Sequence, residues 1–108
     1  AYTPEEGRQA MEAILESGGC DAVFCASDLL AAGVLQSLYR RSIRVPDQIA
    51  VTGYDNTVSA MLSPQISSVA LDCDEIGRQA MALLLRRMED PALEEKEITI
   101  LPTLIARD

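Results

Sequence analysis

The chain contains no histidine, and none of its apolar runs approaches the ~20 residues that a transmembrane helix needs. Without histidine, a Ser-His-Asp triad and the two-histidine zinc motifs are impossible. The three cysteines, Cys20, Cys25 and Cys73, are an odd count without C-x-x-C spacing, which argues against a disulfide framework or a cysteine zinc site. We therefore expect free cysteines in a reducing compartment, with Cys25 as a small core residue.

Basic residues are also scarce, since 9 Lys and Arg stand against 17 Asp and Glu and give a net charge of −8. This charge argues against a chain that grips nucleic-acid phosphates by itself. The glycine-rich motifs G-x-G-x-x-G and G-x-x-x-x-G-K-[ST] are absent, so no phosphate cradle is expected. A length of 108 residues, 48% hydrophobic and 24% charged, is typical of one globular domain or part of one. The N-terminus has neither an initiator Met nor a signal-peptide pattern, and we expect a piece of a longer protein.

Three segments carry helical patterns. The first begins with a Thr3-Pro4-Glu5-Glu6 capping box and is stopped by Ser17-Gly18-Gly19. The second is predicted from Asp28 to Arg41, with Ser27-Asp28 as its cap. The third is predicted from Asp74 to Met88 behind a capping box at Asp72, with an apolar stripe formed by Ile76, Ala80, Leu83 and Leu84.

Short apolar runs between these helices predict β-strands. We expect strands over residues 21–26, 48–54 and 67–71, and short β segments over 98–101 and 103–106. Residues 57–63 predict a short helical or irregular loop, and residues 94–97 a solvated connector. Alternating strands and helices imply an α/β fold with a mostly parallel sheet and right-handed crossovers.

The segment from Arg44 to Asn56 is the most informative part of the sequence. It reads as a Pro46-Asp47 turn, a strand buried on both faces, and a carboxylate at the carboxyl end of that strand, Asp55. Gly53 allows a close approach to the backbone just before it. Because ligands bind outside the carboxyl ends of parallel strands, Asp55 is a candidate ligand contact. The alternative is that Asp55 only caps the next short turn.

Two further patterns concern the helices. The second helix is apolar on more than one face, which indicates a second covered surface, formed either by more of the chain or by a partner subunit. In addition, the pentapeptide Gly7-Arg8-Gln9-Ala10-Met11 recurs as residues 77–81, each time after a capping-box Glu. The match is short, and coincidence stays open beside similar roles in two similar lobes.

Taken together, these motifs resemble the lactose/galactose repressor (LacI/GalR) family over essentially the whole chain. The resemblance follows the family's order and spacing, and no single motif would be decisive. It rests on residues 21–33, Arg44-Val45-Pro46-Asp47, Val51-Thr52-Gly53-Tyr54-Asp55-Asn56, residues 63–69, Glu75-Ile76-Gly77 and residues 101–107.

The resemblance implies an incomplete type I periplasmic-binding-protein-like lobe in an α/β fold, with one helix belonging to a second lobe. Residues 1–69 would form most of the carboxyl-terminal lobe, the effector-binding and dimerisation core. Residues 70–101 would hold the crossover and a helix of the amino-terminal lobe, and residues 102–108 a return strand. The family's helix-turn-helix domain is absent from this sequence.

Family roles can be carried over residue by residue. Tyr2 matches an aromatic that stacks on the effector, although in this chain it could be a frayed terminal residue. Ser27 matches a position that often carries an effector-binding Asn, and it could equally be a helix cap. Asp55 matches a carboxylate that accepts hydrogen bonds from the effector, whereas Cys73 replaces a residue that is often aromatic or apolar, which puts that contact in doubt. The residues implied at the dimer interface, which could instead be lobe core, are Leu29, Ala32, Leu35, Met61 and Leu62.

The sequence thus predicts the effector-binding and dimerising part of a cytoplasmic transcriptional regulator that senses a small polar metabolite, in the first place a sugar. The alternative is a periplasmic sugar receptor of the same fold. An enzyme is the least favoured reading, although Asp28 and Asp55 at adjacent strand ends could in principle hold a metal. We expect no cofactor, a homodimer, no membrane contact, and DNA binding only through a domain outside this chain.

Overall fold

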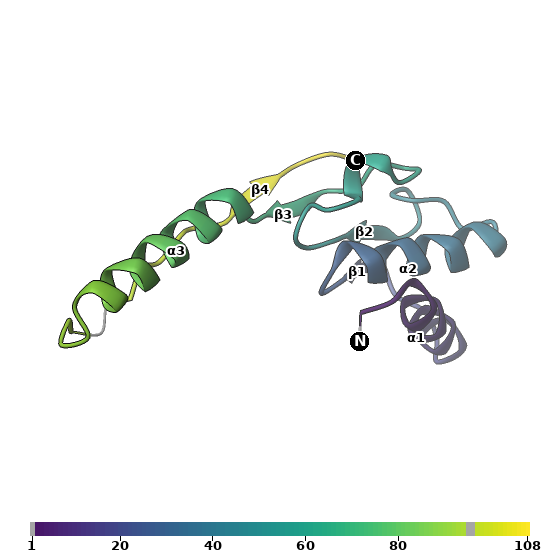
Figure 1. Cartoon of the computed structure of the whole chain (residues 1–108). Coiled ribbons are helices and arrows are strands. Elements are labelled where there is room, and N and C mark those ends of the chain that lie inside the picture. Colours follow the sequence, from purple (N-terminus) through teal and green to yellow (C-terminus); the bar gives the residue numbers. More distant parts are fainter. Residues whose placement is uncertain (1, 95–96) are drawn as a thin grey trace. The chain divides into compact units, whose positions relative to one another are not determined.

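The computed structural model describes residues 2–94 and 97–108, which form two compact units. Among the described residues, the first unit comprises 2–70 and 103–108, and the second comprises 71–94 and 97–102 (Figure 1).

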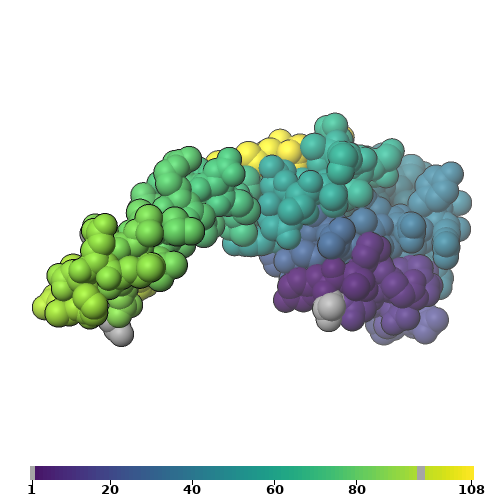
Figure 2. Space-filling view, viewed as in Figure 1, coloured from purple at the N-terminus to yellow at the C-terminus, as the bar shows by residue number. Residues whose placement is uncertain are grey.

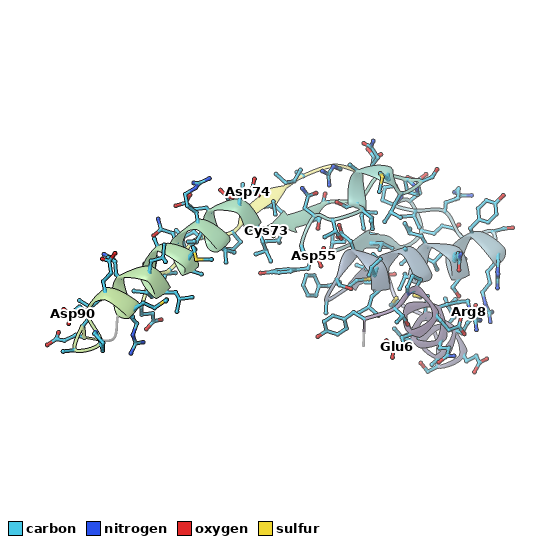
Figure 3. The ribbon with its side chains drawn as sticks, viewed as in Figure 1. Glu6, Arg8, Asp55, Cys73, Asp74 and Asp90 are labelled. Atoms are coloured by element: carbon cyan, nitrogen blue, oxygen red, sulfur yellow. The ribbon has the colours of Figure 1, made fainter. Side chains whose placement is uncertain are left out.

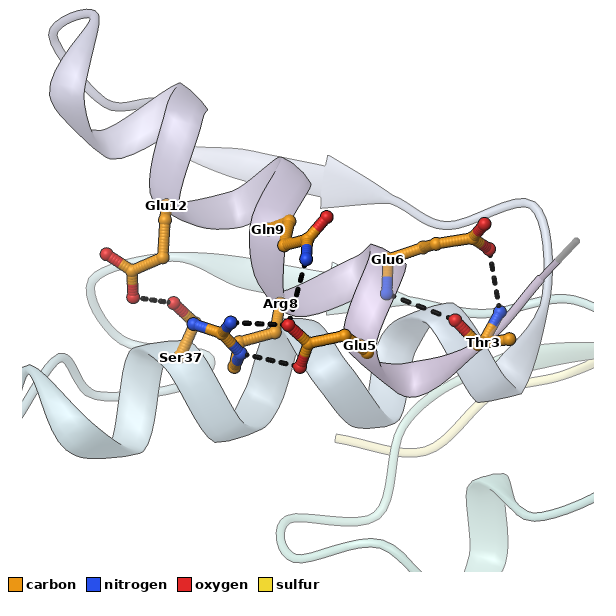
Figure 4. A network of polar contacts seen from close by, with 7 residues as sticks. All are labelled: Thr3, Glu5, Glu6, Arg8, Gln9, Glu12 and Ser37. Carbon is orange, nitrogen blue, oxygen red and sulfur yellow. Dashed lines mark hydrogen bonds and ion pairs between the residues drawn. The ribbon is translucent and has the colours of Figure 1, made fainter.

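The first helix, α1 (Pro4–Glu16), begins where the sequence predicts it. The Glu6 amide donates to Thr3 Oγ1 over 3.2 Å, and the Thr3 amide donates to Glu6 Oε2 over 3.1 Å, so the capping box is complete (Figure 4). On the next turn Arg8 and Gln9 both donate to Glu5, which lowers the pKa of that exposed carboxyl to about 2.

The second helix, α2 (Asp28–Arg40), packs closely against α1 because each helix has a glycine at the contact. A Cβ on Gly33 would lie 1.7 Å from the Pro4 carbonyl oxygen, and a Cβ on Gly7 would lie 2.1 Å from the Leu30 carbonyl oxygen. Polar side chains also link the two helices. The Glu12 carboxylate accepts hydrogen bonds from the buried Ser37 hydroxyl and the Arg41 guanidinium, and Figure 4 shows the first of these.

The strands of the first unit are short. β1 (Ala22–Phe24) pairs in parallel with β2 (Ala50–Thr52), and single parallel bridges then join the β2 side to β3 (Ser68–Ala70). β4 (Thr103–Ile105) returns antiparallel to β3, with Val69 opposite Leu104. Between β2 and β3 lies the 3-10 turn η1 (Ser59–Met61), which agrees with the irregular loop predicted over residues 57–63.

The core of the first unit lies between the helix pair and the strands. It combines Met11 of α1, one face of α2 and the apolar residues that flank or form β1, β2 and β3. Cys25 is 4% exposed there, and burial raises the pKa of its thiol to about 11, which fits the predicted role as a core residue. The buried apolar side chains are Met11, Cys25, Ala31, Val34, Leu35, Leu38, Ile49, Val51 and Ile66.

The second unit consists of α3 (Cys73–Glu89), drawn in green in Figures 1 and 2, and the segment that follows it. The Asp72 side chain caps the helix by accepting from the Glu75 amide over 3.0 Å. No residue of α3 is buried, and its apolar stripe lines an open groove of about 480 Å³ with the segment after the helix. The groove is lined by Ile76, Gln79, Ala80, Leu83, Ile98, Thr99 and Ile100.

One predicted element is wrong and another lies partly outside the described residues. Residues 98–101 do not form a strand, because no neighbouring strand in the described chain offers them backbone partners. The predicted connector over residues 94–97 includes positions 95 and 96, which lie outside the described residues. Within the described residues, no helix has the length and apolar character that crossing a membrane requires.

The helix contact at Gly33 generates a testable prediction. In the 108-residue chain, Gly33→Ala should lower the free energy of unfolding by about 1–3 kcal/mol. The added methyl group would clash with the Pro4 carbonyl oxygen, which is part of the α1 backbone and cannot move without shifting the helix. Urea titration followed by circular dichroism measures the difference.

Gly77→Ala is the matched control. A Cβ at Gly77 meets no atom within 4 Å, so this helical glycine can be replaced freely in the 108-residue chain. The substitution should be neutral or stabilise by about 0.5–1 kcal/mol. Equal effects of the two substitutions would show that the α1–α2 contact is looser than described.

Candidate functional site

The carboxyl end of β2 carries the candidate site predicted from the sequence. After Thr52 the chain continues through Gly53 and Tyr54 to Asp55, whose amide donates to the Val69 carbonyl oxygen over 2.8 Å. Asp55 is therefore fixed beside β3 at the edge where the parallel strands end (Figure 3). This edge is where open α/β sheets bind ligands.

One of the two Asp55 carboxylate oxygens accepts hydrogen bonds from its own loop. Its Oδ1 accepts from the Thr57 hydroxyl over 2.8 Å and from the Thr57 amide over 3.3 Å, which is an Asx-type turn. Within the described residues, no hydrogen bond reaches Oδ2. Asp55 can therefore both cap the turn and serve as a ligand contact, because one oxygen stabilises the turn and the other stays available for a donor.

The backbone of this loop is strained. Asp55 and Asn56 have φ angles of 85° and 53°, so two successive residues with side chains lie in the left-handed region. Asp and Asn tolerate this region better than most residues, but each such residue still costs about 1–3 kcal/mol unless its surroundings hold it.

Asp28 lies beneath the loop and is fully buried. Its Oδ2 accepts from the Ser59 amide over 2.9 Å and the Val58 amide over 3.2 Å, and its Oδ1 accepts from the Ser68 hydroxyl over 2.7 Å. Gly53 is required here because a Cβ at that position would lie 2.2 Å from Asp28 Oδ1. The close approach predicted at Gly53 is thus made by a side chain of the protein itself.

These contacts also bear on the metal alternative. The Asp28 oxygens are occupied by protein donors, and no group of three potential ligand residues that could hold a metal ion occurs in the described part of the chain.

A second residue, Arg107, also holds the loop after Asp55, and the sequence did not predict this role. Its Nη1 donates to Ser59 Oγ over 2.8 Å and to the Ile66 carbonyl oxygen over 3.0 Å, and its Nη2 donates to Asn56 Oδ1 over 2.9 Å. The Arg107 amide also donates to Ser67 Oγ over 2.7 Å. No local pattern announces this role, because the partners lie 40 to 51 positions earlier in the chain.

The other three residues that the resemblance assigns to effector binding differ in exposure. Tyr2 is 62% exposed before α1. Ser27 is 4% exposed and caps α2, its Oγ accepting from the Leu30 amide over 3.2 Å. Cys73 is exposed at the first residue of α3, in the second unit (Figure 3). The structure thus establishes the capping role of Ser27, whereas the effector contacts stay predictions.

The residues predicted for a dimer interface differ in exposure. Met61 is 77% exposed and Leu29 is 44% exposed, whereas Leu35 is 7% exposed and belongs mainly to the core of the first unit. Leu35 also contributes to an open groove of about 300 Å³ beside η1. That groove is lined by Ala32, Leu35, Gln36, Tyr39, Leu62 and Ser63.

Comparison with known proteins identifies the domain. The family model of the periplasmic binding protein-like domain matches residues 1–108. The HTH-type transcriptional repressor PurR of Histophilus somni strain 2336 is 35% identical over 108 residues, which cover 98% of this chain and 32% of the repressor. The chain therefore spans about a third of the length of the curated relatives it matches.

Solved structures agree with this match. A LacI family transcriptional regulator from Enterococcus faecalis V583, with bound ribose, superposes with a TM-score of 0.90 at 28% identity and covers 97% of this chain and 39% of its own. A LacI family regulator from Arthrobacter sp. FB24, in complex with lactose, gives a TM-score of 0.86 at 35% identity over 97% of this chain and 40% of its own. The predicted resemblance to the lactose/galactose repressor family is confirmed, and the chain belongs to the family of periplasmic binding protein-like domains.

Proposed function

We propose that this chain is the effector-binding and dimerising part of a LacI-type transcriptional regulator that senses a small sugar. The observation that carries the proposal is the Asp55 carboxylate, which is fixed at the carboxyl end of β2 with one oxygen free of protein donors in the described residues. Sugar hydroxyls are suitable donors to such an oxygen. The bound ribose and lactose of two similar regulators support a carbohydrate as the effector class.

The proposed mechanism is a population shift. A sugar that binds one arrangement of the two lobes better than the other favours that arrangement in proportion to the difference in affinity. A dimer would pass this bias to DNA-binding domains outside the chain. The proposed location is the cytoplasm, where such a regulator meets DNA.

Two alternatives are weaker. A periplasmic sugar receptor has the same fold, but the curated relative described above is a transcriptional repressor. An enzyme would need reactive groups at the strand ends, whereas the buried Asp28 is occupied by structural hydrogen bonds.

The role of Asp55 can be tested directly. In the intact protein, Asp55→Ala should weaken sugar binding by about 1.5–3 kcal/mol, the range for hydrogen bonds to a charged group. Calorimetric titration with D-ribose and lactose measures the change, and Asp47→Ala, which removes an exposed turn carboxylate, is the matched control. Equal affinity of wild type and a folded Asp55→Ala variant would remove Asp55 from the site.

The remaining effector contacts are part of the same proposal. Tyr2 would stack on an apolar ring face of the sugar, and Ser27 would add a hydrogen bond beside its capping role. Cys73 would contribute from the lobe junction, in place of the aromatic or apolar residue that the family often has there.

The dimer surface is proposed along α2 and η1. Leu29 and Met61 are exposed apolar side chains on elements that flank the same open groove, and a closed two-fold interface would cover them with the equivalent surface of a second copy. Ala32 and Leu62 would contribute beside them, and Leu35 would form the floor of the groove.

Met61→Asp should therefore yield monomers, because the interface would bury a charge without a partner. Sedimentation velocity at micromolar concentration measures the association state. Ala10→Asp, at an exposed position of α1, is the matched control. A monomeric wild-type protein, or a Met61→Asp variant that still dimerises, would contradict the proposed surface.

We also propose that the second unit belongs to the amino-terminal lobe. The recurrent pentapeptide supports this, because it comes with the same side-chain arrangement in both helices. Glu5 accepts from Arg8 and Gln9 in α1, and Glu75 accepts from Arg78 and Gln79 in α3.

The two helices differ in what covers this glycine position. Gly7 in α1 is buried against α2, whereas Gly77 at the equivalent position of α3 is exposed in this chain. The comparison suggests that α3 packs on a helix of the amino-terminal lobe, as α1 packs on α2. On this assignment residues 70–101 hold the crossover and the lobe helix, and residues 102–108 return to the first unit.

The lobe assignment makes Gly77 sensitive to its context. Gly77→Ala should be harmless in the 108-residue chain but should destabilise a protein that carries the whole amino-terminal lobe, by about 1–3 kcal/mol, the usual cost of overpacking. Thermal unfolding of both proteins with and without the substitution measures the contrast. If the substitution is harmless in both proteins, α3 is not packed through Gly77.

A further inference from the structure

We propose that Arg107 and Asp28 are positioning residues that hold the Asp55 loop in its binding geometry from behind. The inference rests on the proposed role of Asp55 in effector binding. Neither residue needs to touch the effector, because both act on the segment from Asn56 to Ser59, which immediately follows Asp55.

The backbone conformation of the loop requires support from the groups around it. Asp55 and Asn56 adopt φ angles of 85° and 53°, which are conformations that side chains disfavour. A loop of this kind persists only where its surroundings over-determine it. The groups that hold it therefore decide where the free oxygen of Asp55 lies.

Asp28 supplies the first of these supports. Its Oδ2 receives the amides of Val58 and Ser59, and its Oδ1 receives the hydroxyl of Ser68. The Ser68 Oγ in turn accepts from the Asn56 amide over 3.1 Å. Asp28 thus holds the loop at both ends, through Ser68 at Asn56 and directly at Ser59.

The guanidinium fork of Arg107 supplies the second support. Its two terminal nitrogens reach Ser59 Oγ and Asn56 Oδ1, and these two acceptors are themselves joined, because the Ser59 hydroxyl donates to Asn56 Oδ1 over 2.8 Å. Within the described part of the chain no carboxylate forms an ion pair with Arg107. The guanidinium thus binds neutral acceptors of the segment between β2 and β3, two in the Asp55 loop and one at Ile66, which is the arrangement expected of a clamp.

The planar fork is essential to this arrangement. A lysine ammonium carries its three donors on one nitrogen at the end of a flexible stem, so it does not reproduce the rigid pair of nitrogens that reaches Asn56 from one side and Ser59 and Ile66 from the other. Arg107→Lys therefore keeps the charge and removes the clamp. Arg41→Lys is the matched control, because Arg41 contacts Glu12 on α1, outside this loop.

The first measurement needs no ligand. In the intact protein, Arg107→Lys should speed hydrogen exchange of the Asn56, Val58 and Ser59 amides about tenfold, the effect of losing a hydrogen bond to a charged group. The amides of Met11 and Leu38, in the helix core, should keep their wild-type rates. Ser59→Ala, which removes one link of the same network, should give the same local pattern if Arg107→Lys proves poorly folded.

The second measurement is a double-mutant cycle on D-ribose affinity, with lactose as a second probe. Arg107→Lys should weaken binding about tenfold in the wild-type background, again the effect of one charged hydrogen bond, and should have no further effect in the Asp55→Ala background. Arg41→Lys should leave the affinity unchanged in both backgrounds.

The outcomes separate this inference from the proposed function. Wild-type exchange in the loop, or equal acceleration at Met11 and Leu38, would overturn the positioning role. Equal losses of affinity in both backgrounds would also overturn it, because Arg107 would then act independently of Asp55. If the wild-type protein binds neither sugar, the proposed sugar sensing fails, and the exchange rates alone decide whether Arg107 holds the loop.

Discussion

The burial of the Asp28 carboxylate is the constraint on which the first unit depends. A carboxylate removed from water costs several kcal/mol unless hydrogen bonds replace its hydration, and here three donors from two other segments do so. The position at the first residue of α2 adds the favourable end of the helix dipole. Because the donors come from the loop after β2 and from Ser68 on β3, satisfying this one group joins the helix, the loop and the sheet.

The same constraint explains the sequence around the candidate site. The carboxylate occupies the space beside Gly53 that any side chain would fill, so the residue after β2 must be glycine. The chain can then turn sharply into the left-handed residues Asp55 and Asn56, which the anchored Val58 and Ser59 amides hold from the other end. The Asp55 carboxylate, which is proposed to bind the effector, is therefore supported from below by the buried structural carboxylate of Asp28.

Local signals in the sequence were enough for the helices and for the position of Asp55. Capping residues fixed the helix starts within a residue, and the turn before β2 placed Asp55 at a strand end. Contacts between residues far apart in the chain could not be predicted from local sequence patterns. Arg107 finds its partners far back in the chain, and residues 98–101 have strand-like composition but no neighbouring strand among the described residues. Leu35 is another such case, because periodicity alone does not tell which apolar face of α2 meets the core of its own unit.

The hydrogen bonds around Ser59 also connect the proposed effector site at Asp55 with the proposed dimer surface at η1. The links run from Asp55 through Asn56 and Ser59 into η1, which ends at the exposed Met61. Ser59 is fully buried, so breaking its links would leave a buried donor or acceptor unsatisfied, which costs about 1–3 kcal/mol. A displacement of the Asp55 loop would therefore strain these bonds unless Ser59 moved with it. If Asp55 binds the effector as proposed, Ser59 is the residue through which a movement of the loop would reach η1.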